Sequence, residues 1–234
     1  MEIIVVPDVH GRMFWKQGRD YLYNNPEAKV VFLGDYLDPY TTYDGITHAE
    51  AYENFLDILE FKKENLDNVV LLRGNHDEWN FNEFRECCRH DYRNTPRNRK
   101  IFQENENLFK FAHLEGNYLF THAGVSTDWL DQNSLDLNES SIVEYLNSNP
   151  NTLWQIGRSR GGRNRCGSPL WCCWEGDWQW NDCQNPFSFT QCIGHTYDTG
   201  DLRKLDSKNI YCFDCAKCFI LNTETKEIKK LNGL

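Results

Sequence analysis

The sequence lacks the two features that take a chain into or across a membrane. Its first residues, Met1 to Pro7, contain no basic region and no small-residue cleavage site. No apolar run approaches the roughly 18 residues of a membrane span. We therefore expect a soluble, untargeted protein of the cytoplasm that makes no contact with a membrane.

Positive charge is also scarce, since 25 Lys and Arg face 35 Asp and Glu and the formal net charge is -10. Nucleic-acid backbones are held by a surplus of basic residues, so general nucleic-acid binding is not expected. One segment is locally basic: Arg158, Arg160, Arg163 and Arg165. A solvated loop and an anion-binding loop explain this Arg158–Arg165 cluster equally well.

Ten cysteines are present, but no signal peptide accompanies them, so reduced thiols are expected. Cys212, Cys215 and Cys218 form two overlapping C-x2-C spacings, and no second C-x2-C pair exists elsewhere. A zinc site needs four ligands, usually from two separated pairs. Ordinary strand and turn positions are therefore favoured over a metal site for these three residues.

No linker, internal repeat or low-complexity tract interrupts the 234 residues, so we predict one domain over residues 1–234. Thr47 and Glu50 form a capping box that begins a helix reaching Lys62, and further helices are expected at about 98–111 and 140–147. An irregular, Trp- and Arg-rich insert is expected at about 151–182.

Short β-branched runs predict strands at 3–6, 29–33, 68–72, 118–121, 189–193, 209–213, 219–222 and 227–231. Helices alternate with strands early in the chain, and the end is all β. This order predicts an α/β fold, a four-layer α/β/β/α sandwich of two mixed β-sheets flanked by helices.

Five polar segments each follow a predicted strand. They are Asp8-Val9-His10-Gly11, Gly34-Asp35-Tyr36-Leu37-Asp38, Gly74-Asn75-His76-Asp77, His122-Ala123-Gly124 and Gly194-His195-Thr196. Side chains at the carboxyl ends of neighbouring strands converge on one crevice of an open sheet. Asp, His and Asn together offer oxygen and nitrogen ligands that suit Mn, Fe or Zn. Each segment alone is weak evidence, but the repetition predicts a metal centre.

These segments resemble those of the calcineurin-like metallophosphoesterase superfamily, and within it the phosphoprotein phosphatase (serine/threonine phosphatase) branch. The strongest stretch is Leu71-Leu72-Arg73-Gly74-Asn75-His76, and the resemblance runs from Asp8 to His195. Many members of the superfamily have a second histidine two positions after the last one. Here that position is Tyr197, and the phosphoprotein phosphatase branch also lacks this histidine.

The resemblance implies two divalent metal ions, with Mn favoured and Fe or Zn as alternatives. Their expected ligands share Asp35: Asp8, His10 and Asp35 for one ion, and Asp35, Asn75, His122 and His195 for the other. Two ions about 3.5 to 4 Å apart lower the pKa of a bridging water and clamp the phosphoryl oxygens. Attack by a metal-bridging hydroxide is therefore expected, without a phosphoenzyme.

His76 resembles the general acid of the branch, and Asp38 resembles the carboxylate that orients it and raises its pKa. Arg73 resembles the branch's phosphate-contacting arginine. Asp77 stands where the branch has Glu, and we expect it to be structural, capping the next helix. Pro39 stands where the branch has another arginine, so one phosphate contact is missing; Arg12 or a member of the Arg158–Arg165 cluster is the expected substitute.

The favoured function is hydrolysis of phosphomonoesters, including phosphoserine and phosphothreonine in proteins. A second possibility is hydrolysis of dinucleoside polyphosphates or other nucleotides, with the tryptophans of the insert as a wall for the base, although a satellite core is the favoured role of those tryptophans. A third is a scaffold that has lost catalysis. It is disfavoured because every ligand position and His76 are filled by suitable residues.

Overall fold

The computed structural model describes residues 1–85, 89–180 and 183–231. Its internal contacts divide the chain into two compact units, and each is described here by itself. The first unit comprises Met1–Lys110 and Ala216–Leu234, and the second comprises Phe111–Cys215. The single domain over residues 1–234 stays a prediction.

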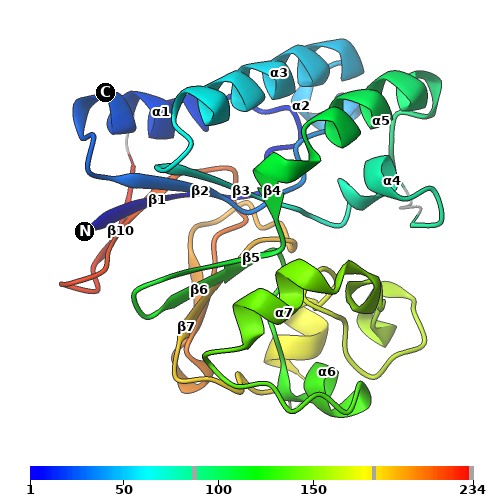
Figure 1. The fold of residues 1–234 in the computed structure, drawn as a ribbon, viewed down its shortest axis with the longest axis vertical. Coiled ribbons are helices and arrows are strands. Elements are labelled where there is room, and N and C mark those ends of the chain that lie inside the picture. The colour runs from blue at the N-terminus through cyan, green and yellow to red at the C-terminus, as the bar shows by residue number, and fades with distance from the viewer. Residues whose placement is uncertain (86–88, 181–182, 232–234) are drawn as a thin grey trace. The chain divides into compact units, whose positions relative to one another are not determined.

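The first unit contains a mixed six-stranded sheet in the order β11-β10-β1-β2-β3-β4. Its strands are β1 (Glu2–Val6), β2 (Lys29–Phe32), β3 (Val69–Leu72), β4 (Phe109–Lys110), β10 (Phe219–Asn222) and β11 (Ile228–Lys230). Strands β1 to β4 run parallel, while β10 pairs antiparallel with β1 and β11 with β10. Strand β10, near the end of the chain, therefore lies beside β1, the first strand, as Figure 1 shows.

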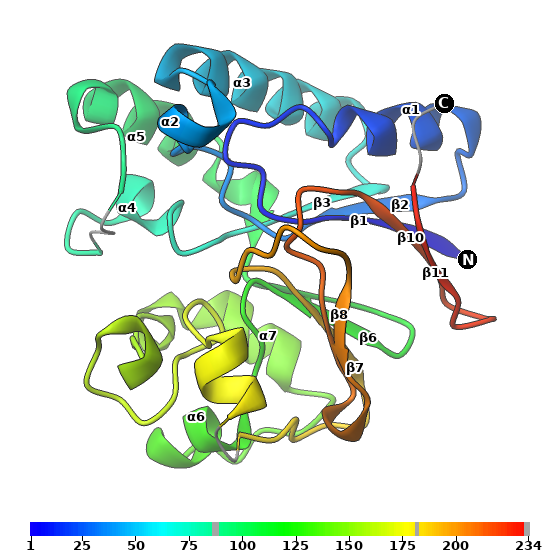
Figure 2. The same cartoon turned by 180° about the vertical axis from the view of Figure 1, so that it is seen from behind.

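The longer helices of the first unit lie over one face of this sheet (Figures 1 and 2). The helices of this unit are α1 (Lys16–Asn24), α2 (Thr41–Asp44), α3 (His48–Glu64), α4 (Glu78–Phe81) and α5 (Thr95–Glu104), with 3-10 turns at Tyr92–Asn94 and Glu106–Leu108. The capping box of Thr47 and Glu50 is confirmed. The helix predicted at 98–111 has wrong bounds, because Pro96 fits a first helical turn and Phe109–Lys110 joins the sheet.

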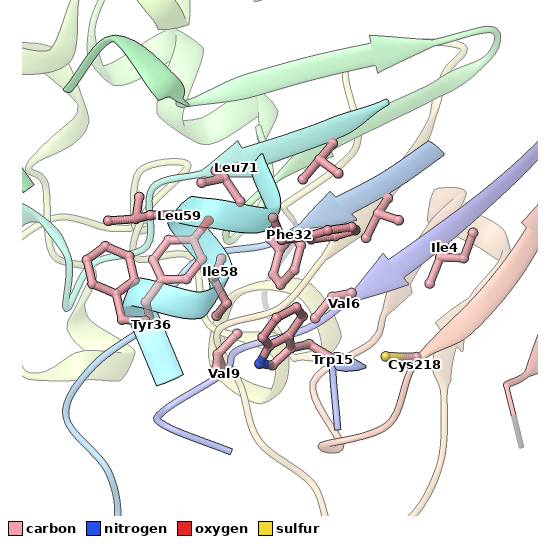
Figure 3. Close-up of a cluster of buried hydrophobic side chains, with 14 of the residues drawn as sticks. Ile4, Val6, Val9, Trp15, Phe32, Tyr36, Ile58, Leu59, Leu71 and Cys218 are labelled. Carbon is pink, nitrogen blue, oxygen red and sulfur yellow. The ribbon is translucent and has the colours of Figure 1, made fainter. Parts of the chain in front are cut away.

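Apolar side chains from the sheet and from α3 form the core of the first unit (Figure 3). Trp15, Phe32 and Ile58 point toward one another there, and the ring centroids of Trp15 and Phe32 are 5.9 Å apart. The ring of Phe55 stacks on that of Phe102 at 4.4 Å, which joins α3 to α5. This packing fixes the sheet whose strand ends carry the predicted ligands.

The second unit contains a mixed five-stranded sheet in the order β5-β6-β7-β9-β8. Its strands are β5 (Ala112–Glu115), β6 (Tyr118–Thr121), β7 (Thr190–Ile193), β8 (Arg203–Leu205) and β9 (Ile210–Cys212). The three central strands run parallel, and α6 (Thr127–Gln132) and α7 (Ile142–Ser148) lie beside them (Figure 2). The predicted fold class is confirmed as mixed α/β, with two mixed sheets flanked by helices.

The insert predicted at about 151–182 is irregular over its described residues, which end at Trp180. It contains 3-10 turns at Pro150–Leu153 and Arg158–Arg160 and one π-helical turn at Trp174–Gln179. Trp174 and Trp178 belong to a buried cluster, so the satellite core is confirmed for these two. In the described part of the chain, no helix is long and apolar enough to cross a membrane.

Candidate metal centre and active site

The loops after β1 and β2 stay paired beyond the ends of their strands. The backbone N–H of His10 donates to the carbonyl of Asp35 at 2.7 Å, and that of Gly11 donates to the carbonyl of Tyr36 at 3.0 Å. Asp8, His10 and Asp35 are all buried at this end of the sheet. The parallel pairing of β1 with β2 therefore brings two of the five predicted segments together.

Three of the predicted site residues in these loops hold a left-handed backbone. The φ angles of His10, Asp35 and Asp38 are 45°, 53° and 62°. Such conformations cost on the order of 1–3 kcal/mol for a residue other than glycine, and they concentrate at functional sites. These loops therefore hold three predicted site residues in strained turns.

The loop after β3 packs directly on Asp35. A Cβ atom added to Gly74 would lie 2.0 Å from Oδ1 of Asp35, so only glycine allows this approach. The same Oδ1 accepts the backbone N–H of His76 at 2.9 Å. Asn75 and His76 are thereby held next to the carboxylate that the sequence predicts as the shared metal ligand.

Asp77 holds the loops after β2 and β3 together, and its predicted role as a helix cap is wrong. Its side chain makes no capping hydrogen bond to α4. Instead, its Oδ2 accepts the backbone N–H of Asp35 at 2.8 Å and of Gly74 at 2.7 Å, and its Oδ1 accepts that of Tyr36 at 3.0 Å. Burial and the charge of Asp35 raise the pKa of Asp77 well above its ordinary value.

The chemistry of His10 fits a metal ligand. Its Nδ1 lies 3.0 Å from the carbonyl of Leu37, which makes Nδ1 the protonated nitrogen and leaves the lone pair on Nε2. Nε2 lies 3.6 Å from Oδ2 of Asp35. Burial lowers the pKa of His10 well below its ordinary value, which favours the neutral imidazole that binds metals.

His76 and Asp38 form the pair that the sequence predicts. Nδ1 of His76 lies 3.1 Å from Oδ2 of Asp38 and 2.9 Å from the carbonyl of Arg89. With two acceptors, Nδ1 carries a proton, and Nε2 is the atom that can exchange a proton with a substrate. Burial lowers the pKa of His76, but Asp35 and Asp38 outweigh burial and raise it above its ordinary value.

The two remaining predicted ligands, His122 and His195, lie together in the second unit, at the ends of β6 and β7. The backbone N–H of Gly194 donates to the carbonyl of His122 at 2.8 Å. Nε2 of His122 lies 3.1 Å from Nδ1 of His195, and His195 has a φ of 68°. Two imidazoles on one tetrahedral ion place their nitrogens about 3.3 Å apart, so this pair also fits a metal.

The arginines predicted to bind phosphate have other partners. Arg73 donates to Glu106 at 2.8 Å and to Glu78 at 3.3 Å, and its guanidinium lies 3.6 Å from the centre of the Phe81 ring. Its predicted role in phosphate binding stays a prediction.

The expected substitutes for the arginine missing at Pro39 have different hydrogen-bond and ion-pair partners. Arg12 makes an ion pair with Asp44 at 2.9 Å. In the Arg158–Arg165 cluster, whose four arginines are exposed, Arg160 donates to the carbonyl of His195 at 3.2 Å and to Oγ1 of Thr196 at 2.8 Å. Arg160 is therefore the member of the cluster that reaches a predicted ligand.

Arg89 is a candidate that no sequence motif indicates. Its Nη1 donates to the carbonyl of Asp38 at 2.6 Å, its Nη2 lies 3.5 Å from Nδ1 of His10, and its guanidinium covers the Tyr40 ring at 3.5 Å. It follows no predicted strand and belongs to none of the five segments.

A hollow of about 370 Å³ opens beside Arg89 in the first unit. Three tyrosines and two histidines are among its lining residues, which begin with Pro39 directly after Asp38. The lining residues are Pro39, Tyr40, Thr41, Thr42, Tyr43, His48, Arg89, His90 and Tyr92. The hollow therefore lies next to the His76–Asp38 pair, because Pro39 follows Asp38 in the sequence and the carbonyl of Arg89 contacts His76.

The predicted ligands are carboxylates, imidazoles and an amide that follow the ends of strands, and the His76–Asp38 pair could supply a proton. Groups of these kinds are suited to the metal-assisted cleavage of phosphate esters. The family profile of calcineurin-like phosphoesterases matches residues 1–197, and the chain belongs to this family of phosphoester hydrolases. The resemblance to the calcineurin-like superfamily is thereby confirmed, and the assignment to the phosphoprotein phosphatase branch stays a prediction.

Solved structures of two phosphatases have a similar fold. A protein serine/threonine phosphatase from Saccharomyces cerevisiae has 15% sequence identity and a TM-score of 0.60, over 100% of this chain and 80% of that one. A cold-active protein-tyrosine phosphatase from a psychrophilic Shewanella species has 13% identity and a TM-score of 0.64, over 99% of this chain and 80% of that one. At such identities the likeness concerns the fold alone.

Proposed function

We propose that this chain hydrolyses phosphate monoesters, phosphoserine and phosphothreonine in proteins among them, with two divalent metal ions, of which Mn is favoured. One observation carries the proposal. Donor atoms of two buried proposed ligands, His10 and Asp35, lie within 4.8 Å of each other and of His76, the proposed general acid, in the first unit. This is the concentration of donors that a metal-assisted phosphoryl transfer requires.

The proposed ligands are those that the family resemblance implies. They are Asp8, His10, Asp35 and Asn75 from the first unit, and His122 and His195 from the second. The bound ions would acidify a water and polarise the phosphoryl oxygens. Hydrogen bonds from outside the ligand set, such as that between His10 and Leu37, orient the ligands toward the ions.

In this proposal His76 is the general acid. Asp38 and the carbonyl of Arg89 hold Nδ1, so that Nε2–H passes its proton to the leaving oxygen as the P–O bond breaks. General acids of this kind contribute roughly 10²- to 10⁴-fold to the rate. The raised pKa of His76 keeps the proton available until the leaving oxygen needs it.

Arg89 is proposed as the guanidinium that binds a phosphoryl oxygen in place of the arginine missing at Pro39. The carbonyl of Asp38 and the Tyr40 ring hold it in position beside His10. A planar, permanently charged donor suits the charge that develops on a transferring phosphoryl group.

The aromatic hollow favours a second candidate, hydrolysis of nucleotides such as dinucleoside polyphosphates. Its volume of about 370 Å³ and its tyrosine walls suit a planar base, and it adjoins the proposed general acid. Tyr43 lines the hollow and is 88% exposed, so its ring is available to a ligand.

A side-by-side assay separates the two candidates. The Mn-loaded protein is given a phosphothreonine peptide and a dinucleoside tetraphosphate, and kcat/KM is measured for each, with Tyr43→Ala as the matched variant. We expect faster turnover of the peptide and no change in Tyr43→Ala. Faster turnover of the nucleotide, with a loss in Tyr43→Ala, would establish the second candidate instead. No turnover of either substrate, or of an aryl phosphate, would contradict both and favour the scaffold.

A further inference from the structure

Three thiols and one carboxylate gather in the interior of the second unit, in the tryptophan-rich insert and just after it. Cys166, Cys183 and Asp177 have no exposed surface, and Cys172 is 1% exposed. The three cysteines belong to the same buried cluster as the rings of Trp174 and Trp178. None of the four residues belongs to the five strand-end segments.

The donor atoms lie at distances that one metal ion can span. Sγ of Cys166 lies 3.4 Å from Sγ of Cys172, and these two atoms and a carboxylate oxygen of Asp177 all lie within 4.8 Å of one another. The thiol of Cys183 neighbours that of Cys166 and lies outside this close group of three donors. Thiolates on one tetrahedral zinc ion, with Zn–S bonds of about 2.3 Å, lie about 3.8 Å apart.

The chain folds back sharply between the first two cysteines. The backbone N–H groups of Trp171 and Cys172 both donate to the carbonyl of Ser168, at 2.8 and 2.9 Å, which closes a turn. At Gly167 an added Cβ would lie 2.2 Å from the carbonyl oxygen of Trp171. Only glycine therefore allows the turn that returns Cys172 to Cys166.

Asp177 is held in place by hydrogen bonds from the same turn. Its Oδ2 accepts the backbone N–H of Gly167 at 3.2 Å and of Cys173 at 2.9 Å, and its Oδ1 accepts the hydroxyl of Ser159 at 2.7 Å. Carboxylates that bind metals are oriented by such hydrogen bonds. The residue directly after each of the first two cysteines thus holds the carboxylate beside their thiols.

We propose that Cys166, Cys172, Cys183 and Asp177 bind one structural zinc ion. Cys166, Cys172 and Asp177 supply three preplaced ligands, and Cys183, beside Cys166, moves in as the fourth when the ion binds. The burial of the four residues makes this a closed tetrahedral site without a position for substrate. The three thiols release their protons to solvent as the ion binds, so zinc uptake is steeply dependent on pH. The ion joins the turn at 166–172 to the segment at Cys183 and stabilises an insert that has little regular structure.

Cobalt substitution tests the site directly, because thiolates bound to Co²⁺ give a charge-transfer absorption that oxygen and nitrogen ligands do not. The ligands proposed for the catalytic ions include no sulfur, so the two sites are distinguishable. The full chain is purified under reducing conditions, stripped of metal and titrated with Co²⁺. We expect the thiolate absorption at one Co²⁺ per chain, and its disappearance when Zn²⁺ is added.

Matched variants identify the ligands. Cys172→Ser is expected to abolish the absorption, while Cys192→Ser, which changes another fully buried thiol in the same unit, is expected to keep it. Asp8→Ala is also expected to keep it, since it alters only the proposed catalytic ligands.

Two results would overturn the zinc site. One is a titration of the unchanged chain without thiolate absorption, a result that does not depend on whether any variant folds. The other is a Cys166–Cys172 disulfide, found by peptide mapping, in protein that contains no zinc.

Discussion

At the residue scale, Asp38 contacts both the proposed general acid, His76, and the proposed phosphate-binding residue, Arg89. Its Oδ2 faces Nδ1 of His76, its Oδ1 accepts the backbone N–H of Asp91 at 3.2 Å, and its carbonyl accepts Nη1 of Arg89. Its left-handed backbone lets one residue make all these contacts, because the side chain and the carbonyl point to different partners. Asp38 thus sets the orientation of both His76 and Arg89.

Replacing Asp38 by Asn tests the acid pair. The variant removes a charge that raises the pKa of His76, while burial still lowers it, so the pKa of His76 falls. Because protonated His76 is the active form, activity is lost as pH rises through this pKa. We therefore expect the alkaline limb of the kcat profile to move to lower pH, with kcat reduced roughly 10- to 100-fold.

Leaving groups of different acidity provide the control for Asp38→Asn. A nitrophenolate leaves without much help from an acid, so the loss of kcat is expected to be smaller for nitrophenyl phosphate than for phenyl phosphate. An equal loss for both substrates, with an unmoved alkaline limb, would remove His76 and Asp38 from proton transfer.

Replacing Arg89 by Ala tests its proposed contact with the phosphoryl group. We expect kcat/KM to fall about 100-fold, or about 2.7 kcal/mol, and Arg89→Lys to recover only part of it because Lys lacks the two-pronged donor. Competitive inhibition by inorganic phosphate should weaken in parallel. Arg12→Ala is the matched control, since Arg12 is paired with Asp44. Unchanged phosphate inhibition in Arg89→Ala, or a larger loss in Arg12→Ala, would refute the assignment.

At the scale of elements, the strands that carry the predicted ligands could be predicted because they are short β-branched runs ending at glycine or polar residues. The long helix α3 was predictable from its capping box. Helix α1 was not, because no side chain caps its start and only Gly18 and Leu22 of its nine residues are buried. The two-residue strand β4 was missed because so short a segment has no alternation to detect.

Asp77 joins the loop after β2 to the loop after β3, so its replacement should lower the stability of the first unit. Asp77→Ala leaves three backbone N–H groups, in the loops after β2 and β3, without their acceptor. Asp77→Asn keeps an oxygen for two of them. We expect the free energy of unfolding to fall by roughly 1–3 kcal/mol in Asp77→Asn and by more in Asp77→Ala, as measured by urea denaturation. Equal losses in the two variants would contradict this account of Asp77.

At the scale of the whole molecule, the five segments that revealed the family are spread over most of the chain, and the family match spans residues 1–197. These segments could be recognised in the sequence because each directly follows a run of residues that predicts a strand. Arg89 and the cluster of Cys166, Cys172 and Cys183 could not, because none of these residues directly follows a predicted strand. The sequence argument about zinc concerned only the C-x2-C spacings of Cys212, Cys215 and Cys218. It did not consider Cys166 with Cys172, whose longer spacing is closed by a turn.

The most direct test of the central claim is the dependence of phosphate-ester hydrolysis on metal ions and on Asp35. Nitrophenyl phosphate turnover is measured on protein stripped by a chelator and then reloaded with Mn²⁺, for the unchanged chain and for Asp35→Asn. We predict that stripping abolishes activity, that Mn²⁺ restores it, and that Asp35→Asn stays inactive while its circular dichroism is unchanged. Turnover that survives stripping, or that persists in Asp35→Asn, would contradict a metal-dependent phosphoesterase centred on Asp35.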